Sequence, residues 1–128
     1  MIDASALLQA LIDKGGRGSE LRGRLAVSEC HAQHLTDAEI GNVLRRHERA
    51  GRLSASEASA ALKLADALLA HRYPHRGGLA ARAWELRDRL TFYDALYVTL
   101  AERLGLALLS ADQRISRTRG LSCTVEVT

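Results

Sequence analysis

The chain contains little proline, cysteine or lysine, and it has no long apolar run. One Pro and ten Gly among 128 residues are too few for a disordered or low-complexity protein. No stretch approaches the roughly 20 apolar residues that a membrane-spanning helix needs. The N-terminus lacks the basic start and the small-residue cleavage site of a signal peptide. We therefore expect a cytoplasmic protein with no membrane partner.

Cysteine and lysine are both scarce. Cys30 and Cys123 are isolated from each other and lack metal-ligand spacing, so we expect core residues rather than a disulfide or a zinc site. Of the 18 basic residues, only Lys14 and Lys63 are lysines. Arginine suits bidentate phosphate contacts, which indicates a nucleic-acid partner. A codon bias toward arginine and alanine explains the same composition equally well.

The hydrophobic pattern predicts helices alternating with short strands in one domain, residues 1–128. At 47% hydrophobic residues, the chain can bury a core. Helices are predicted over residues 6–12, 36–50, 54–69, 79–90, 91–104 and 112–118. Strands are predicted over residues 1–2, 30–35 and 106–110 and at "CTVEV", while "KGGRGSE" and "HRYPHRGG" predict loops. The alternation predicts an α/β fold with a mostly parallel central sheet covered by helices on both faces.

Four acids are predicted to meet at one edge of this sheet. Helix 91–104 would span about 21 Å and strand 106–110 would return about 16 Å, which brings Asp94 close to Asp112. Asp3 follows the first strand, and Glu39 lies in the first turn of the helix after the second strand. The carboxyl ends of parallel strands lie along one edge, where open α/β sheets bind ligands.

Each acid also fits a purely structural role. Thr36 precedes Glu39, and Thr91 precedes Asp94, with the spacing of a capping box; the other two acids could be N-caps. However, two carboxylates 4 Å apart repel by about 4 kcal/mol at an effective dielectric near 20. Four converging acids without a basic partner would need to be protonated, to point away from one another, or to bind a cation. Because hard cations such as Mg²⁺ take oxygen ligands, the pattern indicates a metal site.

Several segments resemble PIN-domain proteins and, more narrowly, the VapC toxins of bacterial toxin–antitoxin pairs. These segments are "IDASALL", "LTDAEIGNVLRR", "RAWELRDRL" and "LTFYDALYVTLAERLGLALLSAD", and the resemblance covers nearly the whole chain. It implies a three-layer α/β/α sandwich and a metal-dependent endoribonuclease that acts as a toxin. One or two Mg²⁺ ions are implied, with Mn²⁺ as a substitute. The metal would activate a water that attacks the phosphodiester and would neutralise transition-state charge.

The resemblance also implies which residues form the site. Asp3 and Asp94 are expected as direct ligands, and Glu39 as a ligand or a water-orienting group. Asp112 would complete the site. The implied small polar neighbours are Ser5 and Ser110.

The implied partners are RNA, an antitoxin and a second copy of the chain. The RNA would be of the transfer or ribosomal class, held by phosphate contacts. Arg114 and Arg117, just after the last acid, are expected to contact it. The run Arg45, Arg46, Arg49 and Arg52 is interpreted instead as a solvated helix face. A small VapB-like antitoxin would cover the acidic site, and the chain would form a homodimer.

Three alternatives compete with this interpretation. A receiver domain needs paired acids after the first strand and a late-strand Lys, and the chain has neither. A haloacid-dehalogenase-like phosphatase needs an acid where the chain has Ser5. The main alternative is a catalytically silent PIN fold that only binds RNA or a partner.

Two further residue patterns are interpreted as structural. His71 and His75 have helical metal-ligand spacing, but Pro74 interrupts that helix, so we expect surface histidines. Trp84 and Tyr97 are expected in the core, and Tyr93 is the aromatic residue best placed to stack on a base.

Overall fold

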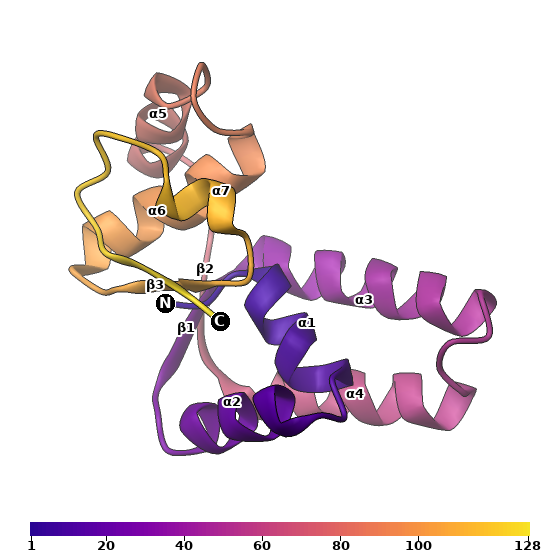
Figure 1. Ribbon diagram of the computed structural model, residues 1–128. Coiled ribbons are helices and arrows are strands. Elements are labelled where there is room, and N and C mark those ends of the chain that lie inside the picture. Colours follow the sequence, from indigo (N-terminus) through magenta and orange to yellow (C-terminus); the bar gives the residue numbers. More distant parts are fainter.

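The computed structural model describes all residues, 1–128, as an α/β sandwich (Figure 1). None of its helices combines the length and apolar character needed to cross a membrane. The helices are α1 (Ala4–Ile12), α2 (Gly16–Ala26), α3 (His34–Arg49), α4 (Ala55–Leu68), α5 (Gly78–Glu85), α6 (Phe92–Leu104) and α7 (Gln113–Ser116). The strands are β1 (Cys30–Gln33), β2 (Leu69–Tyr73), β3 (Leu108–Ser110) and β4 (Val125–Val127).

The N-terminal residues join two parallel strand pairs into one sheet. Strand β1 pairs with β2, and β3 pairs with β4, both in parallel. Between these pairs, the Ile2 N–H donates to the His31 carbonyl at 2.9 Å, and the Leu109 N–H donates to the Met1 carbonyl at 2.8 Å. The order across the sheet is therefore β2, β1, residues 1–3, β3 and β4. As predicted, the sheet is parallel, because Ile2 also bridges Leu109 in parallel.

Helices cover both faces of this sheet, which confirms the predicted layers. Neighbouring residues of a strand point to opposite faces, and β3 shows this directly. Leu109 packs into the core formed by α1 to α4, whereas Leu108 packs into the core formed by α5, α6 and α7. Figure 1 shows these two groups of helices on opposite sides of the strands. All three residues of β3 are buried, as expected for a strand covered on both faces.

Strand β2 was not predicted. The sequence indicates a helix to residue 69 followed by a loop, but α4 ends at Leu68 and β2 begins at the next residue. The strand forms because it pairs with β1, a partner more than 30 residues away in the sequence. Such a partner leaves no local signal. Pro74, which predicted the loop, comes directly after the strand.

The glycine-rich segment "KGGRGSE" was also interpreted wrongly as a loop, since most of it forms the start of α2. Leu21 and Leu25 give this helix a buried face. Gly18 is needed for packing rather than for flexibility, because a Cβ there would lie 2.2 Å from the Asp13 carbonyl oxygen. Packing against α1 therefore overrides the low helix propensity of glycine.

Several helix boundaries follow the sequence. Ser54 and Glu57, which have capping-box spacing in the sequence, form a capping box at the start of α4. Gly105 ends α6 at φ +64°, a left-handed conformation typical of glycine after a helix. Two residues expected in the core are exposed instead: Trp84 at 60%, and Leu62, in the apolar stripe of the predicted helix 54–69, at 49%.

We expect Leu108→Ala to destabilise the protein by about 2–5 kcal/mol, because Leu108 is fully buried and its loss leaves a cavity. Urea unfolding measures the change. Val27→Ala is the control, since Val27 is 87% exposed and should cost less than about 1 kcal/mol. Equal unfolding midpoints for the two variants would contradict the two-faced packing of β3.

Candidate active site

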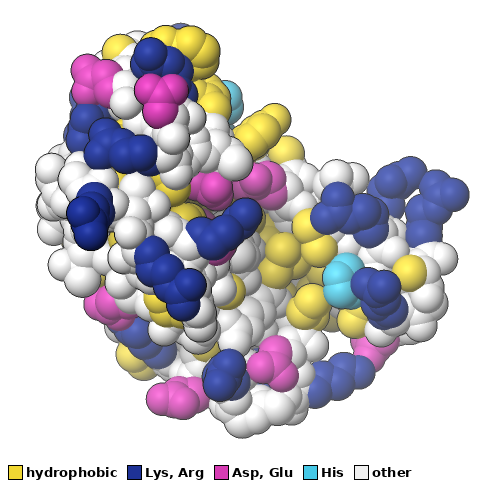
Figure 2. Space-filling view, turned by 45° about the horizontal axis from the view of Figure 1, so that its top comes forward, with side chains coloured by type: hydrophobic (Ala, Val, Ile, Leu, Met, Phe, Trp, Pro, Cys, Tyr) yellow, Lys and Arg dark blue, Asp and Glu magenta, His cyan; other side chains and the backbone are white.

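Asp3, Glu39, Asp94 and Asp112 line one cavity of about 350 Å³. They come from the N-terminal segment, α3, α6 and the turn before α7. Figure 2 shows acidic side chains in a hollow near the centre of this face, with basic side chains around it. The fold thus brings together the four acids that the sequence predicted at one edge of the sheet.

Asp3 is the most buried of these acids, at 5% exposure. Its Oδ1 accepts hydrogen bonds from the Ser5 hydroxyl at 2.7 Å and from the Ala6 N–H at 2.9 Å. It is also the N-cap of α1, as its structural interpretation predicted. Burial raises the pKa of Asp3, and these hydrogen bonds to the carboxylate only partly oppose the shift.

Glu39 and Tyr97 form a hydrogen-bonded pair in the same cavity. The Tyr97 hydroxyl donates to the Glu39 carboxylate and is also within 3.0 Å of the Thr36 hydroxyl. Burial raises the pKa of Glu39, and repulsion from Asp3 and Asp94 adds to this shift, while the Tyr97 hydrogen bond opposes it. Burial and the neighbouring Glu39 also raise the pKa of Tyr97, which therefore stays protonated and donates.

The predicted capping box of Thr36 with Glu39 is wrong. Helix α3 begins at His34 with Gln33 as its N-cap, so Thr36 lies inside the helix, fully buried. At α6 the cap is confirmed, because the Asp94 N–H donates to the Thr91 hydroxyl oxygen at 3.2 Å. That hydroxyl in turn donates to Asp94 Oδ2 at 2.7 Å, which fixes the carboxylate at the start of the helix.

Asp112 has a basic partner that the sequence argument did not include. Arg114 Nη2 lies 2.5 Å from Asp112 Oδ2, and Arg114 Nε lies 3.0 Å from both carboxylate oxygens. The hydrogen bonds from Arg114 lower the pKa of Asp112. Asp112 is also the N-cap of α7, as its structural interpretation predicted. The predicted RNA contact Arg114 is thus engaged by an acid of the cavity, while Arg117 donates to Gln113 Oε1 at 3.1 Å.

Ser5 and Ser110 link Asp3 to the backbone that carries Asp112. The Ala111 N–H donates to Ser5 Oγ at 2.9 Å, and the Asp112 N–H donates to Ser110 Oγ at 2.9 Å. The two hydroxyl oxygens are 3.4 Å apart. Both serines therefore act on the backbone that positions the acids, in addition to the contact of Ser5 with Asp3.

The donor set of the cavity fits a hard divalent cation. It offers carboxylate oxygens, and the raised pKa values of Asp3 and Glu39 show that their negative charge is poorly compensated. No three of the four carboxylates bring oxygens within 4.8 Å of one another. Each acid instead turns to a local partner: Ser5, Tyr97, Thr91 or Arg114. This separation reduces the repulsion between the anions, and a cation would draw them closer together.

Three polar residues of the cavity were not predicted as site residues: Tyr97, Asn42 and Arg46. Helical spacing could have found the last two, because residues three and seven positions after Glu39 share its face of α3. Arg46 had been assigned to a solvated face. Tyr97 was expected in the core and is 3% exposed, but its hydroxyl reaches the cavity. Its partner Glu39 lies on another helix, so sequence spacing carries no signal for their contact.

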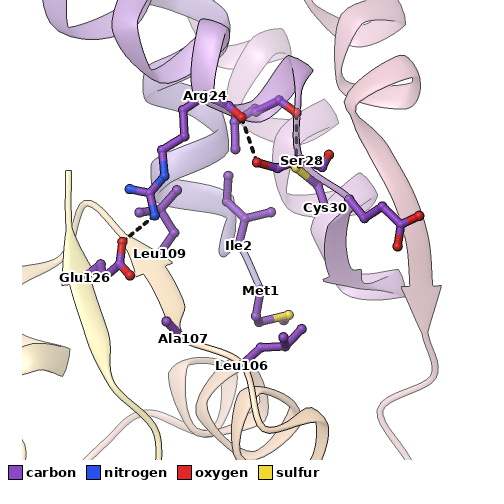
Figure 3. Close-up of a pocket in the computed structure, with 11 residues that line it drawn as sticks. Met1, Ile2, Arg24, Ser28, Cys30, Leu106, Ala107, Leu109 and Glu126 are labelled. Atoms are coloured by element: carbon purple, nitrogen blue, oxygen red, sulfur yellow. Dashed lines mark hydrogen bonds and ion pairs between the residues drawn. The ribbon is translucent and has the colours of Figure 1, made fainter.

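A second hollow, of about 230 Å³, lies at the amino ends of the strands (Figure 3). Met1, Ile2, Leu106 and Ala107 contribute to a largely apolar wall. Its Glu126 is paired with Arg24, whose carbonyl accepts from the Ser28 hydroxyl. Because this hollow lacks the converging acids, the cavity at the carboxyl ends of the strands is the candidate active site.

Comparisons with known proteins identify the family of the chain. The PIN domain family model matches residues 1–121. The chain is 42% identical over 127 residues to Ribonuclease VapC1 of Mycobacterium tuberculosis, covering 99% of this chain and 96% of that protein. It is 41% identical over 117 residues to Ribonuclease VapC3 of the same species, covering 91% of this chain and 85% of that protein.

A solved structure shares the fold. The crystal structure of PAE2754 from Pyrobaculum aerophilum superposes with a TM-score of 0.71 at 29% sequence identity, covering 94% of this chain and 84% of that one. The sequence match and the shared fold extend over nearly the full length of the chain. The chain therefore belongs to the PIN domain family, among its VapC-type members.

Proposed function

We propose that the protein is a metal-dependent endoribonuclease that acts as the toxin of a VapBC-type toxin–antitoxin pair. It would hydrolyse phosphodiester bonds of structured or single-stranded RNA in the cytoplasm. One observation carries the proposal: four carboxylates from distant segments line one cavity in a chain whose curated relatives are named ribonucleases. Metal-dependent hydrolysis of RNA needs such a concentration of oxygen ligands to hold a divalent cation.

The four acids would hold Mg²⁺, with Mn²⁺ as a substitute. A bound ion of this kind lowers the pKa of a water and neutralises charge on the phosphate. Asp3 and Asp94 would be direct ligands, since Ser5 and Thr91 hydrogen-bond only one carboxylate oxygen of each. Glu39 would bind the ion or orient the water, with its carboxylate held by Tyr97. Asp112 would complete the site.

The arginines near the cavity would position the RNA. A phosphate would compete with Asp112 for the exposed guanidinium of Arg114, so that RNA binding frees this carboxylate. Arg117 follows on the same short helix, and Arg46 reaches the cavity from α3. Such contacts hold the backbone and read no sequence. We infer a substrate of the transfer or ribosomal RNA class.

The proposal includes two protein partners. A VapB-like antitoxin would lay a segment across the acidic cavity and exclude RNA. A second copy would pack through the middle helices, where Leu62 and Leu64 of α4 are exposed at 49% and 36%. Light scattering of the purified chain would show a mass twice that of the chain.

The main alternative is a catalytically silent PIN fold that only binds RNA or a partner. The ion pair of Asp112 with Arg114 favours it, because one of the four carboxylates is already neutralised. Cleavage assays separate the two possibilities directly.

Asp94→Asn should reduce RNA cleavage at least about 100-fold, equivalent to about 2.7 kcal/mol of transition-state stabilisation, because it removes a ligand charge while the Thr91 cap remains. The assay uses purified chain free of antitoxin with Mg²⁺, and EDTA should stop the wild type. Asp88→Asn is the matched control, since Asp88 is exposed and lies outside the cavity. If Asp94→Asn cleaved RNA at the wild-type rate, the enzymatic proposal would be wrong.

Tyr97→Phe should move the acidic limb of the pH–rate profile to higher pH. The Tyr97 hydrogen bond lowers the pKa of Glu39, so its loss raises that pKa, and a higher pH is then needed to ionise the carboxylate. The single-turnover cleavage rate between pH 5 and pH 9 measures the limb. Tyr93→Phe, at an exposed tyrosine, should leave it in place. An unmoved limb in Tyr97→Phe would show that ionisation of Glu39 does not limit the rate.

Mg²⁺ or Mn²⁺ should raise the thermal midpoint more at pH 8 than at pH 5. The folded-state pKa values of Asp3 and Glu39 are raised, so the folded protein binds more protons than the unfolded chain. These two acids therefore make the metal-free protein lose stability as the pH rises above the pKa values that they have in the unfolded chain. A bound cation offsets that loss. Asp3→Asn should reduce the effect. A midpoint insensitive to both ions would contradict metal binding in the cavity.

A further inference from the structure

Strands β1 and β2 carry a second group of metal-ligating side chains, separate from the acidic cavity. Glu29 precedes β1, His31 lies in β1, and His71 lies in β2. The two histidines are register partners in the parallel pair, so their side chains stand on the same side of the sheet. None of the three residues lines the cavity of the four acids. Figure 1 shows the two strands running side by side.

The three side chains are close together. The imidazole rings of His31 and His71 stack with centroids 4.6 Å apart and an angle of 24° between the planes. Glu29 Oε2 lies 3.8 Å from His71 Nε2. One ring nitrogen of each histidine and one carboxylate oxygen of Glu29 all lie within 4.8 Å of one another, and no other group of acids, histidines or cysteines in the chain does so.

A fourth residue holds His31 in a suitable orientation. The Tyr73 hydroxyl lies 2.8 Å from His31 Nδ1, two residues beyond His71 on the same face of β2. Histidines that bind a metal usually hydrogen-bond through the nitrogen that does not face the ion, and this contact fixes the tautomer and the ring. When His31 Nδ1–H donates to the Tyr73 oxygen, Nε2 of His31 carries the lone pair that a metal ion needs.

We propose that Glu29, His31 and His71 bind a divalent transition-metal ion of the Zn²⁺ class, bridging β1 and β2. Two imidazoles and one carboxylate with an open fourth position form a known tetrahedral ligand set for Zn²⁺. Imidazole selects this class of ion, whereas carboxylates alone suit Mg²⁺. The two sites therefore differ in the metal that they take.

The rearrangement needed to close this site involves side chains. Ligand atoms on one tetrahedral Zn²⁺ ion lie about 3.3 Å apart, so the present spacing, which reaches up to 4.8 Å, must shrink by up to about 1.5 Å. The stacked imidazole rings must also turn so that one nitrogen of each points at the ion. The side chains of Glu29 and His71 are 82% and 47% exposed, and both can rotate without disturbing the core. An ion held there ties the two strands together through their side chains.

Co²⁺ binding to the full chain, without an affinity tag, tests the proposal. Excess Mg²⁺ is kept in the solution to occupy the acidic cavity. Four-coordinate Co²⁺ with nitrogen ligands absorbs strongly in the visible range, whereas six-coordinate Co²⁺ with oxygen ligands absorbs weakly. We expect the strong spectrum for the wild type, and its displacement by Zn²⁺.

His71→Ala and Glu29→Gln should each weaken Co²⁺ binding at least about tenfold. Both side chains are exposed, so these variants are expected to fold, and circular dichroism checks this. His75→Ala is the matched control, at an exposed histidine beyond the strand, and should bind like the wild type. Tyr73→Phe should weaken binding without abolishing the spectrum.

Two outcomes would overturn the proposal: a weak six-coordinate spectrum for the wild type, or equal affinities for the wild type and His71→Ala. The test is independent of the proposed ribonuclease activity. His71→Ala should cleave RNA in Mg²⁺ at the wild-type rate, because His71 lies outside the acidic cavity.

Discussion

The insertion of residues 1–3 between β1 and β3 determines the geometry of the candidate site. Ile2 bonds to His31 on one side, and Met1 and Asp3 bond to Leu109 on the other. These backbone bonds join two separate strand pairs into one sheet and leave Asp3 at its carboxyl edge. The chain then turns directly into α1 with Asp3 as the N-cap. The position of the most buried acid therefore follows from backbone pairing.

The acids around Asp3 are positioned by short-range partners. Each carboxylate accepts hydrogen bonds from nearby groups, and Asp3 accepts from both Ser5 and Ala6. The four acids line one cavity, but no three of them bring oxygens within 4.8 Å of one another. Burial nevertheless raises the pKa values of Asp3 and Glu39. The buried, poorly compensated negative charge at this edge of the sheet therefore favours a positively charged ligand.

Capping and ligand binding are compatible at this edge. Asp3 and Asp112 are N-caps, and Asp94 lies in the first turn of α6. Asp3 uses only Oδ1 for its cap, which leaves its second oxygen available. Because helices follow strands at the carboxyl edge of a parallel sheet, a residue that begins a helix there also faces the ligand position. Such an acid can therefore cap a helix and face a ligand at the same time.

The sequence by itself determined the α/β class, most helices, strand β3 and the four acids at one edge, because these follow from local periodicity and from element lengths. Tertiary structure alone decided that residues 69–73 form a strand and that a glycine-rich segment forms α2. It also decided the contacts of Tyr97 with Glu39, of Arg114 with Asp112, and of His31 with His71. Most of these features depend on a partner distant in the sequence. Helical and strand periodicity describe only which side of an element is buried, so they cannot identify the residue that packs against it.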